Sequence, residues 1–384
     1  RGVDAQGGQA LAHGGVVEHG IQLGVQPGDH RRRRAGRRQQ ASERLAFHAL
    51  DALLFQHLQH ADVRVMVLHA HPLETSYNRS LCNAVVDALT AKGHQVDLVD
   101  LYAENFDPVL SRDSTRSCAS CHFAERAFSD STAVSFGIEG RAGVRNSPML
   151  ANVAYQKKLL REANLPTLEM QVLVPVQEHN EFDFNLVEIT ERLRRMPEYV
   201  DAARQAYGRD PDPFVVTRAI AAFERTLLSG DSPWDRWFFQ GKTDALSAAA
   251  QRGYDLFRSE RLNCSKCHEG FLFTSQQVAN NGLYEVYPDS GRMRLTGLEI
   301  DRAMFKIPSL RQVAVTAPYM YDGSLPTLAA VIDHYDSGGY AHPNKSPLVR
   351  PLGLTAGEKA DLLAFLHALT DTGFLNNPDY RAPE

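Results

Sequence analysis

The strongest chemical signal in this sequence is the motif Cys-x-x-Cys-His, which occurs twice. Two cysteines at this spacing can form thioether bonds to both vinyl groups of one haem, and the adjacent histidine can then reach the iron as an axial ligand. Two copies predict a dihaem cytochrome with covalently bound c-type haems. The residues are Cys118, Cys121 and His122 in the first copy, and Cys264, Cys267 and His268 in the second.

Two other uses of paired cysteines were weighed. A Cys-x-x-Cys pair can be a redox dithiol, and the four thiols together could form one all-cysteine zinc site. Neither alternative explains why a histidine follows both pairs. Of the five cysteines, only Cys82 lies outside the motifs, so there is no disulfide framework to build. Cys82 falls in an apolar helical pattern and is interpreted as a buried small hydrophobic residue.

The composition is that of an ordinary globular protein. The chain has 384 residues, of which 43% are hydrophobic and 23% charged, enough for two or three domains. A net charge of −5 gives no reason to expect binding to nucleic acid or to an anionic membrane. No apolar stretch is long enough to span a bilayer. No secretory signal is visible in residues 1–60, although attachment of haem to this motif in bacteria follows export, so we expect a periplasmic protein.

The first 106 residues differ in character from the rest. Residues 1–62 are rich in Gly, Gln, His and Arg and include "HRRRRAGRR". We interpret them as a disordered or non-native segment; a basic tail that binds acidic partners is the alternative. Residues 63–106 then predict a β-α-β unit from "VRVMVLHAHP", "NRSLCNAVVDALTAKGH" and "QVDLVDLY".

This β-α-β unit resembles a fragment of the flavodoxin-like NAD(P)H quinone reductases. The resemblance is carried by His69-Ala-His71-Pro72 and Ser76-Tyr77-Asn78, which match a flavin phosphate loop at a helix N-terminus. Flavin sites in such folds need loops from several further strands. The fragment has none of these strands, so a working flavin domain is not expected, and a flavin quinone reductase is a distant rival hypothesis.

From residue 107 onward the pattern is helical with long loops. A helix that ends near "LLSGDSPWDRW" and an extended segment after it place a domain junction near residue 230. The fold class is therefore mainly α, with one cytochrome c-like haem domain over 107–230 and another over 231–384. Helices are predicted at 185–195, 198–207, 213–229, 244–258, 325–335 and 355–369.

Residues 107–384 resemble the bacterial dihaem cytochrome c peroxidase family, which includes the methylamine-utilisation, quinone-maturing type. The matching phrases are "FDPVLSRDSTRSCASCH", "RNSPMLANVAY", "PTLEMQVLVPVQEHNEF" and "FKIPSLRQVAVTAPYMYDGSLPTLAAVIDHY". The resemblance implies that hydrogen peroxide reacts at the first haem and that Glu181 and Gln171 act there. A carboxylate can carry a proton between the two peroxide oxygens, and an amide can orient the peroxide.

Three positions depart from the commonest pattern of the family. Ile138 stands where many members have a histidine that closes the first iron, which predicts an open iron position. Tyr335 stands where ordinary dihaem peroxidases have the methionine ligand of the second iron, as in the quinone-maturing type; Met320 and His334 are the alternative ligands. Arg161 stands where relatives carry a tryptophan that relays electrons between the haems.

The resemblance also implies a cation and a haem contact. Relatives hold one Ca²⁺ between the domains through an Asn side chain and two backbone carbonyl groups, which match Asn146, Thr316 and Pro318 here. Lys306 takes a basic position that pairs with a haem propionate. These assignments rest on the resemblance alone.

Together these features predict a periplasmic dihaem peroxidase. A small cytochrome c or a cupredoxin would donate electrons through the second haem. The first alternative uses the same peroxide chemistry to oxidise side chains of a partner protein, as in quinone-cofactor maturation. The second alternative is an electron carrier without turnover.

Overall fold

The computed structural model describes residues 64–69, 90–91, 95–100 and 110–380. Near its start, β1 (Arg64–His69) and β2 (Gln95–Asp100) pair in parallel, with Arg64 opposite Gln95 and His69 opposite Asp100. Parallel neighbours need a crossover connection, as the predicted β-α-β unit has. The segment 1–62, almost all of the connecting helix, and the predicted phosphate loop beyond His69 lie outside the described residues.

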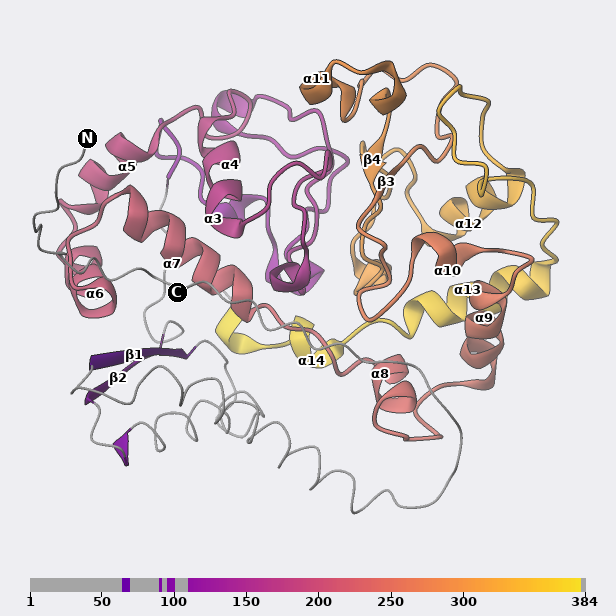
Figure 1. Cartoon of the computed structure of the whole chain (residues 1–384), viewed down its shortest axis with the longest axis horizontal. Helices are drawn as coiled ribbons and strands as arrows, with labels where there is room; N and C mark the ends of the chain where they lie inside the picture. The colour runs from indigo at the N-terminus through magenta and orange to yellow at the C-terminus, as the bar shows by residue number, and fades with distance from the viewer. Residues whose placement is uncertain (1–63, 70–89, 92–94, 101–109, 381–384) are drawn as a thin grey trace, which may run out of the picture. The chain divides into compact units, whose positions relative to one another are not determined.

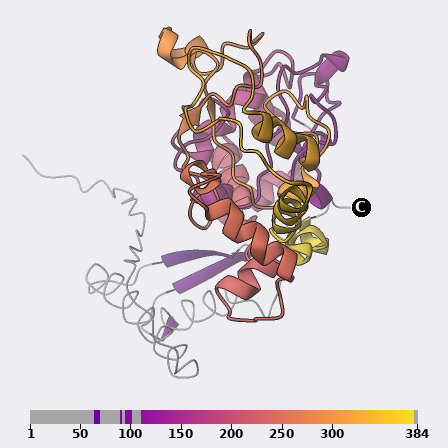
Figure 2. The same ribbon diagram turned by 90° about the vertical axis from the view of Figure 1, so that its right-hand side faces the viewer.

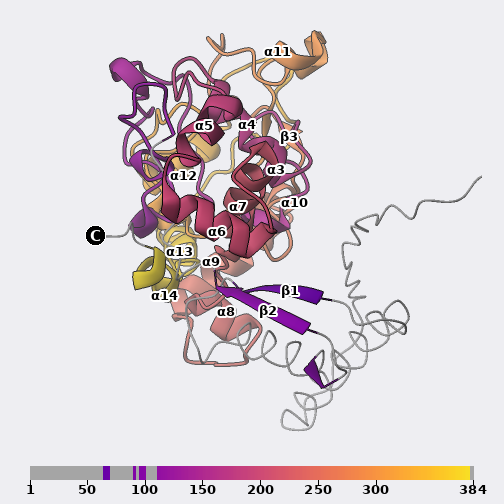
Figure 3. The ribbon, with the colours of Figure 1, turned by 90° about the vertical axis from the view of Figure 1, so that its left-hand side faces the viewer.

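Residues 110–226 form short helices joined by long loops, as predicted for the first haem region. The longest helix is α7, and Figures 1 and 3 show α3 and α5 lying against it. The elements are η1 (Cys118–Ser120), η2 (Ala124–Arg126), η3 (Ile138–Gly140), η4 (Val153–Tyr155), α3 (Leu168–Gln171), α4 (Leu173–Gln177), α5 (Leu186–Leu193), α6 (Pro197–Tyr207) and α7 (Pro213–Thr226).

Residues 233–380 form the second haem region, which is again mainly helical with one short two-stranded sheet, β3 and β4, paired antiparallel. The elements are α8 (Pro233–Phe238), α9 (Ala248–Arg258), α10 (Cys264–Cys267), β3 (Val278–Ala279), α11 (Met293–Thr296), η5 (Glu299–Asp301), β4 (Phe305–Lys306), η6 (Val313–Val315), α12 (Leu328–Ser337), α13 (Ala356–His367), α14 (Thr372–Leu375) and η7 (Pro378–Tyr380).

All six helices predicted from the sequence are present, and their caps explain where they begin. Asp212 accepts a hydrogen bond from the backbone N–H of Val215 and so starts α7. The predicted extended segment after residue 230 is wrong from Pro233 onward. The Ser232 side chain caps the first turn, and Pro at the first helical position suits a helix start, so α8 forms there.

Of four apolar cores among the described residues, one lies in each region as its main core, and another joins Phe128 of the first region to Phe374 and Tyr380 of the second. The core of the second region requires a close crossing of α9 and α13 (Figures 1 and 2). A Cβ atom on Gly253 would stand 1.9 Å from the backbone oxygen of Asp361, so only glycine permits this approach. The first core includes Leu110, Val172, Val176, Phe182, Leu186, Ile189, Leu193 and Val216; the second includes Trp234, Tyr254, Phe257, Phe273, Ile332, Phe365 and Leu369.

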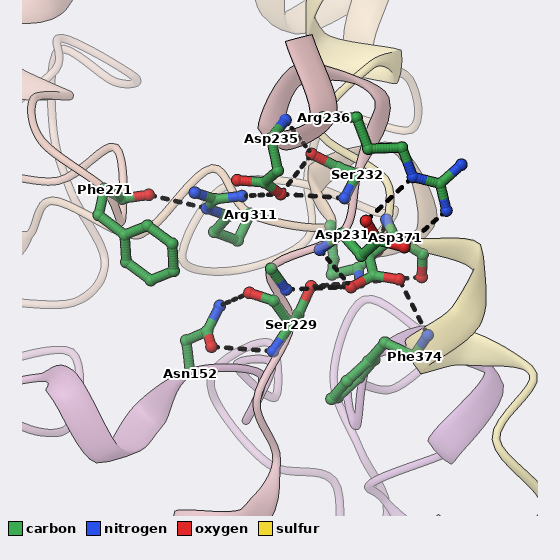
Figure 4. Close-up of polar contacts among 12 residues, drawn as sticks. Asn152, Ser229, Asp231, Ser232, Asp235, Arg236, Phe271, Arg311, Asp371 and Phe374 are labelled. Carbon is green, nitrogen blue, oxygen red and sulfur yellow. Dashed lines mark hydrogen bonds and ion pairs between the residues drawn. The ribbon is translucent and has the colours of Figure 1, made fainter. Parts of the chain in front are cut away.

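The segment between α7 and α8, where the domain junction is predicted, is held by buried hydrogen bonds (Figure 4). The carboxylate of Asp371 accepts from the backbone N–H groups of Gly230 and Asp231, at 3.0 Å each. The Asn152 side chain donates to the Ser229 carbonyl at 2.8 Å and accepts from the Ser229 N–H at 2.9 Å. The predicted domain boundaries themselves stay a prediction. None of the helices in the described residues is long and apolar enough to cross a membrane.

Candidate haem and peroxide sites

The histidine of the first motif is oriented by a backbone carbonyl group. Nδ1 of His122 lies 2.6 Å from the carbonyl oxygen of Phe128, which the chain brings back through a tight turn with positive φ at Ala127 and Phe128. A proton on Nδ1 leaves Nε2 as the nitrogen with a free lone pair, which is the form that binds iron. Burial lowers the pKa of His122, which keeps the ring neutral.

The second motif repeats this arrangement. Nδ1 of His268 lies 3.0 Å from the carbonyl oxygen of Phe273, which has a positive φ of 51°. Burial lowers the pKa of His268 as well. Two motifs far apart in the sequence thus place the same histidine nitrogen on a carbonyl a few residues downstream.

The cysteines of both motifs suit attachment to a group from outside the chain. None of the four is in a disulfide. Burial raises the pKa of Cys121, Cys264 and Cys267, so these thiols are not poised as thiolates. Within the described residues no three His, Cys, Asp or Glu side chains gather into a metal site, which argues against the all-cysteine zinc alternative. Cys82 lies outside the described residues.

Glu181 lies beside the first motif and has a strongly shifted pKa. Burial and then the charge of Glu178 raise its pKa to about 7, and its charge in turn acts on Cys121. A carboxyl group with a pKa near 7 can both take up and release a proton at neutral pH. The structure therefore brings the predicted catalytic carboxyl group to the first haem motif.

A loop around Gly137 fixes the backbone of Glu181. The Ile138 N–H donates to the Glu181 carbonyl oxygen at 3.0 Å, and Ile138 is fully buried. A Cβ atom on Gly137 would lie 2.1 Å from the Asn180 oxygen and 2.7 Å from Cα of Glu181. The contact needs glycine at this position.

The contacts of Gln171 do not link its side chain to Glu181. It is the last residue of α3, half-buried, and its backbone N–H donates to the Thr167 carbonyl as part of the helix start. Among the described residues its side chain makes no hydrogen bond. Its predicted role beside Glu181 therefore stays a prediction.

Tyr335 lies on α12 beside the second motif. Burial raises its pKa, the Asn281 side chain opposes this by hydrogen bonding, and Cys267 and Cys264 lie within electrostatic reach of it. Both alternative ligands also bond to Asn281. The Asn281 amide donates to the Met320 sulfur at 3.2 Å, and Nε2 of His334 lies 3.1 Å from the Asn281 carbonyl oxygen. Asn281 thus forms hydrogen bonds with both side chains that are the alternatives to Tyr335 as the iron ligand.

The residues of the predicted calcium and propionate sites lie where the two haem regions meet. The ammonium group of Lys306 donates to the side chain of Gln156 and, at 3.1 Å, to the Lys158 carbonyl oxygen. Asn146 is buried, and its backbone N–H donates to the Tyr321 carbonyl at 2.8 Å. Thr316 ends η6, and the peptide bond between Ala317 and Pro318 is cis.

An ion-pair network across the same junction was not predicted. Arg145 holds Asp289 through two bonds of 2.6 and 3.0 Å and also pairs with Glu162. Glu162 is 1% exposed and accepts a second bond of 2.6 Å from Arg294. No local sequence pattern marks these pairs, because the partners are far apart in the chain. Trp234, by contrast, packs in the core as expected.

The comparisons with known proteins agree with this geometry. A family model described as di-haem cytochrome c peroxidase matches residues 103–244. The methylamine utilization protein MauG of Methylorubrum extorquens is 36% identical over 271 residues, which cover 69% of this chain and 75% of that protein. Cytochrome-c peroxidase IdrP1 of Denitromonas iodatirespirans is 36% identical over 313 residues, covering 72% and 82%. The chain belongs to this family.

A solved structure of a relative shows the same fold. It is a MauG-like protein associated with microbial copper homeostasis, 35% identical, with a TM-score of 0.68 over 74% of this chain and 91% of that chain. Membership of the di-haem cytochrome c peroxidase family confirms the predicted family, the two haems and the class of peroxidase-type oxidoreductase. The flavodoxin-like assignment of residues 63–106 is not tested by these matches.

Proposed function

We propose that this chain reduces hydrogen peroxide at a haem held covalently by Cys118, Cys121 and His122. The observation that carries the proposal is Glu181, a carboxyl group whose pKa is raised to about 7 beside that motif. When bound, the haem supplies an iron that delivers electrons to the oxygen–oxygen bond. Reduction of one peroxide to two waters takes two electrons and two protons.

The chain's own part is to move the proton. Glu181 takes a proton from the oxygen nearer the iron and returns it to the outer oxygen, which leaves as water. Its raised pKa keeps the carboxyl group ready for both steps near neutral pH. Gln171 orients the peroxide. Ile138 has no group that can bind iron, so it would not block peroxide, and no prior reduction would be needed.

Cys264, Cys267 and His268 would hold the second haem covalently, and Tyr335 would supply a further oxygen ligand to its iron. The Tyr335 side chain lies within electrostatic reach of both cysteines, although Tyr335, Met320 and His334 all form hydrogen bonds with Asn281. A tyrosine oxygen lowers the reduction potential of a haem relative to methionine. Lys306 pairs with a haem propionate. Electrons arrive from a small cytochrome c or a cupredoxin, in the periplasm.

Oxidation of side chains in a partner protein is the second candidate. Tyr335 favours it, because a low-potential second haem is better suited to hold oxidising equivalents than to pass electrons on from a donor. Arg161 favours the peroxidase function instead. The family resemblance implies an aromatic side chain that relays charge between the haems at this position, and a guanidinium cannot be oxidised in that way.

A peroxide titration of the haem-loaded chain, followed by absorption and electron paramagnetic resonance, separates these candidates. Oxidation at one haem, with turnover when reduced cytochrome c is added, is the result expected of the peroxidase. Loss of both ferric signals with one equivalent of peroxide would favour the partner-oxidising function. No spectral response would leave an electron carrier and contradict both.

The predicted calcium site differs from the haem sites in how well its residues suit the expected ligand. Calcium in proteins takes six to eight oxygen ligands at about 2.3–2.6 Å. In this structure both oxygen atoms of Asn146 accept hydrogen bonds from the guanidinium of Arg161. The oxygen atoms of Asn146 are therefore already bound to a cationic group, and no step of the proposed reaction depends on calcium.

A further inference from the structure

Arg161 makes an unusual contact with Asn146 at the junction of the two haem regions. One nitrogen of its guanidinium, Nη2, donates to the backbone oxygen of Asn146 at 2.8 Å and to the side-chain oxygen at 3.2 Å. The other polar groups of Asn146 are also used, because its N–H donates to Tyr321 and its amide donates to the Thr132 carbonyl at 3.1 Å. Each of the two Asn146 oxygens therefore already accepts a hydrogen bond from a cationic group.

A second guanidinium reaches the other half of the expected calcium site. Nη2 of Arg126 donates to the carbonyl oxygen of Ala317, the residue between Thr316 and Pro318. Arg126 and Arg161 both come from the first haem region, whereas Ala317 belongs to the second. Arginine side chains thus donate hydrogen bonds to both of the segments that were predicted to share a calcium ion.

The charges around Arg161 oppose a further cation. The charge of Arg145 acts on Arg161, and the charge of Arg161 acts on Lys306. Like charges already act on one another here, with Asp322 and Glu162 as the acidic groups that act on Arg161. A divalent ion beside Asn146 would add twice the repulsion of a single charge.

Arg161 is also fixed at its backbone to the second haem region. Its carbonyl oxygen accepts a hydrogen bond of 2.6 Å from the N–H of Lys306 in β4. The side chain reaches Asn146 in the first region, and Asn146 in turn bonds to Tyr321 in the second. One residue therefore joins contacts on both sides of the junction.

We infer that the guanidinium of Arg161 is the built-in cation of this junction, so that the two haem regions are held together without calcium. A fixed side chain takes the place of an exchangeable ion at the Asn146 oxygens. The inference rests on family membership and on these contacts, and does not depend on the proposed peroxidase activity.

The test uses the haem-loaded full chain and measures metal content and thermal unfolding. After desalting, we expect far less than one calcium per chain, and neither a calcium chelator nor millimolar calcium should shift the Tm. In Arg161→Leu the Asn146 oxygens are released, so the Tm should fall and millimolar calcium should restore part of the loss. Arg204→Leu is the matched control, because it removes a surface arginine paired with Asp210.

Two results would overturn the inference. One is a calcium ion that survives desalting of the unaltered chain and whose removal lowers the Tm. The other is an Arg161→Leu variant that folds, loads both haems and shows no response to calcium. If that variant does not fold, the metal content and chelator response of the unaltered chain decide the question alone.

Discussion

The backbone N–H of Ile138 donates to the carbonyl oxygen of Glu181 at 3.0 Å, which fixes the carboxyl residue to the loop that passes beside it. The residue before this donor is Gly137, whose Cα faces the backbone of Asn180 and Glu181 without room for a Cβ atom. Ile138, at the position predicted from the family resemblance to hold an iron-closing histidine, therefore supports the backbone of the residue proposed to carry the proton.

Gly137→Ala should impair peroxide chemistry while leaving the haems in place. A methyl group 2.1 Å from the Asn180 oxygen must push the Glu181 loop away. Misplacement of a catalytic group by about 1 Å can cost roughly 10²-fold in rate. The measurement is the rate constant for reaction with peroxide, beside the haem absorption spectrum.

Gly357→Ala is the control for this substitution, because nothing lies closer than 4.0 Å to a Cβ at that helix position. An unchanged rate in Gly137→Ala would show that the Glu181 loop does not need this close approach.

Tyr335→Met should raise the reduction potential of the second haem. Replacing an anionic oxygen ligand with a thioether stabilises the reduced iron, and axial ligands tune haem potentials over about 0.8 V. A rise on the order of 0.1 V or more is expected in a redox titration, with the first haem unaffected. Tyr340→Phe, at an exposed tyrosine, is the control and should change neither potential. Equal potentials in Tyr335→Met and the unaltered chain would rule out Tyr335 as the ligand.

The pH dependence of the peroxide reaction should follow Glu181. Because the carboxylate form takes the first proton, the rate should rise with pH through about 7 and then level off. Glu178 contributes to the raised pKa, so Glu178→Gln should move the midpoint of the rise to lower pH. The exposed Glu125→Gln is the control and should leave the profile in place. If the midpoint of the pH profile does not move in Glu178→Gln, a group other than Glu181 controls the pH dependence of the reaction.

The parts of the fold that depend on a single short segment of sequence could be predicted. Helices such as α7 and α13 have polar caps and an apolar face within a single segment, and each haem motif is five residues long. The family phrases also singled out Glu181 and Tyr335, whose roles stay predictions. Helix α8 was not predicted because a Ser-Pro cap is a weak signal just after Gly230.

The junction contacts could not be predicted, because they join distant segments. Nothing near Glu162 in the sequence indicates that a buried carboxylate will hold Arg145 and Arg294. Arg161 was recognised as the replacement for an aromatic relay, but its contact with Asn146 depends on the packing of two loops. A match to a family pattern suggested calcium ligands, whereas the neighbouring side chain decides what those oxygens bind.

The most direct test of the proposed peroxidase function is the rate at which haem-loaded Glu181→Gln reacts with peroxide, measured by stopped-flow absorption beside Glu178→Gln. Glutamine keeps the size of the side chain but cannot carry the proton, so the rate at neutral pH should fall by about 10²–10⁴-fold and lose its pH dependence. Glu178→Gln should stay within a few-fold of the unaltered chain. A Glu181→Gln variant that reacts at the original rate would contradict the account.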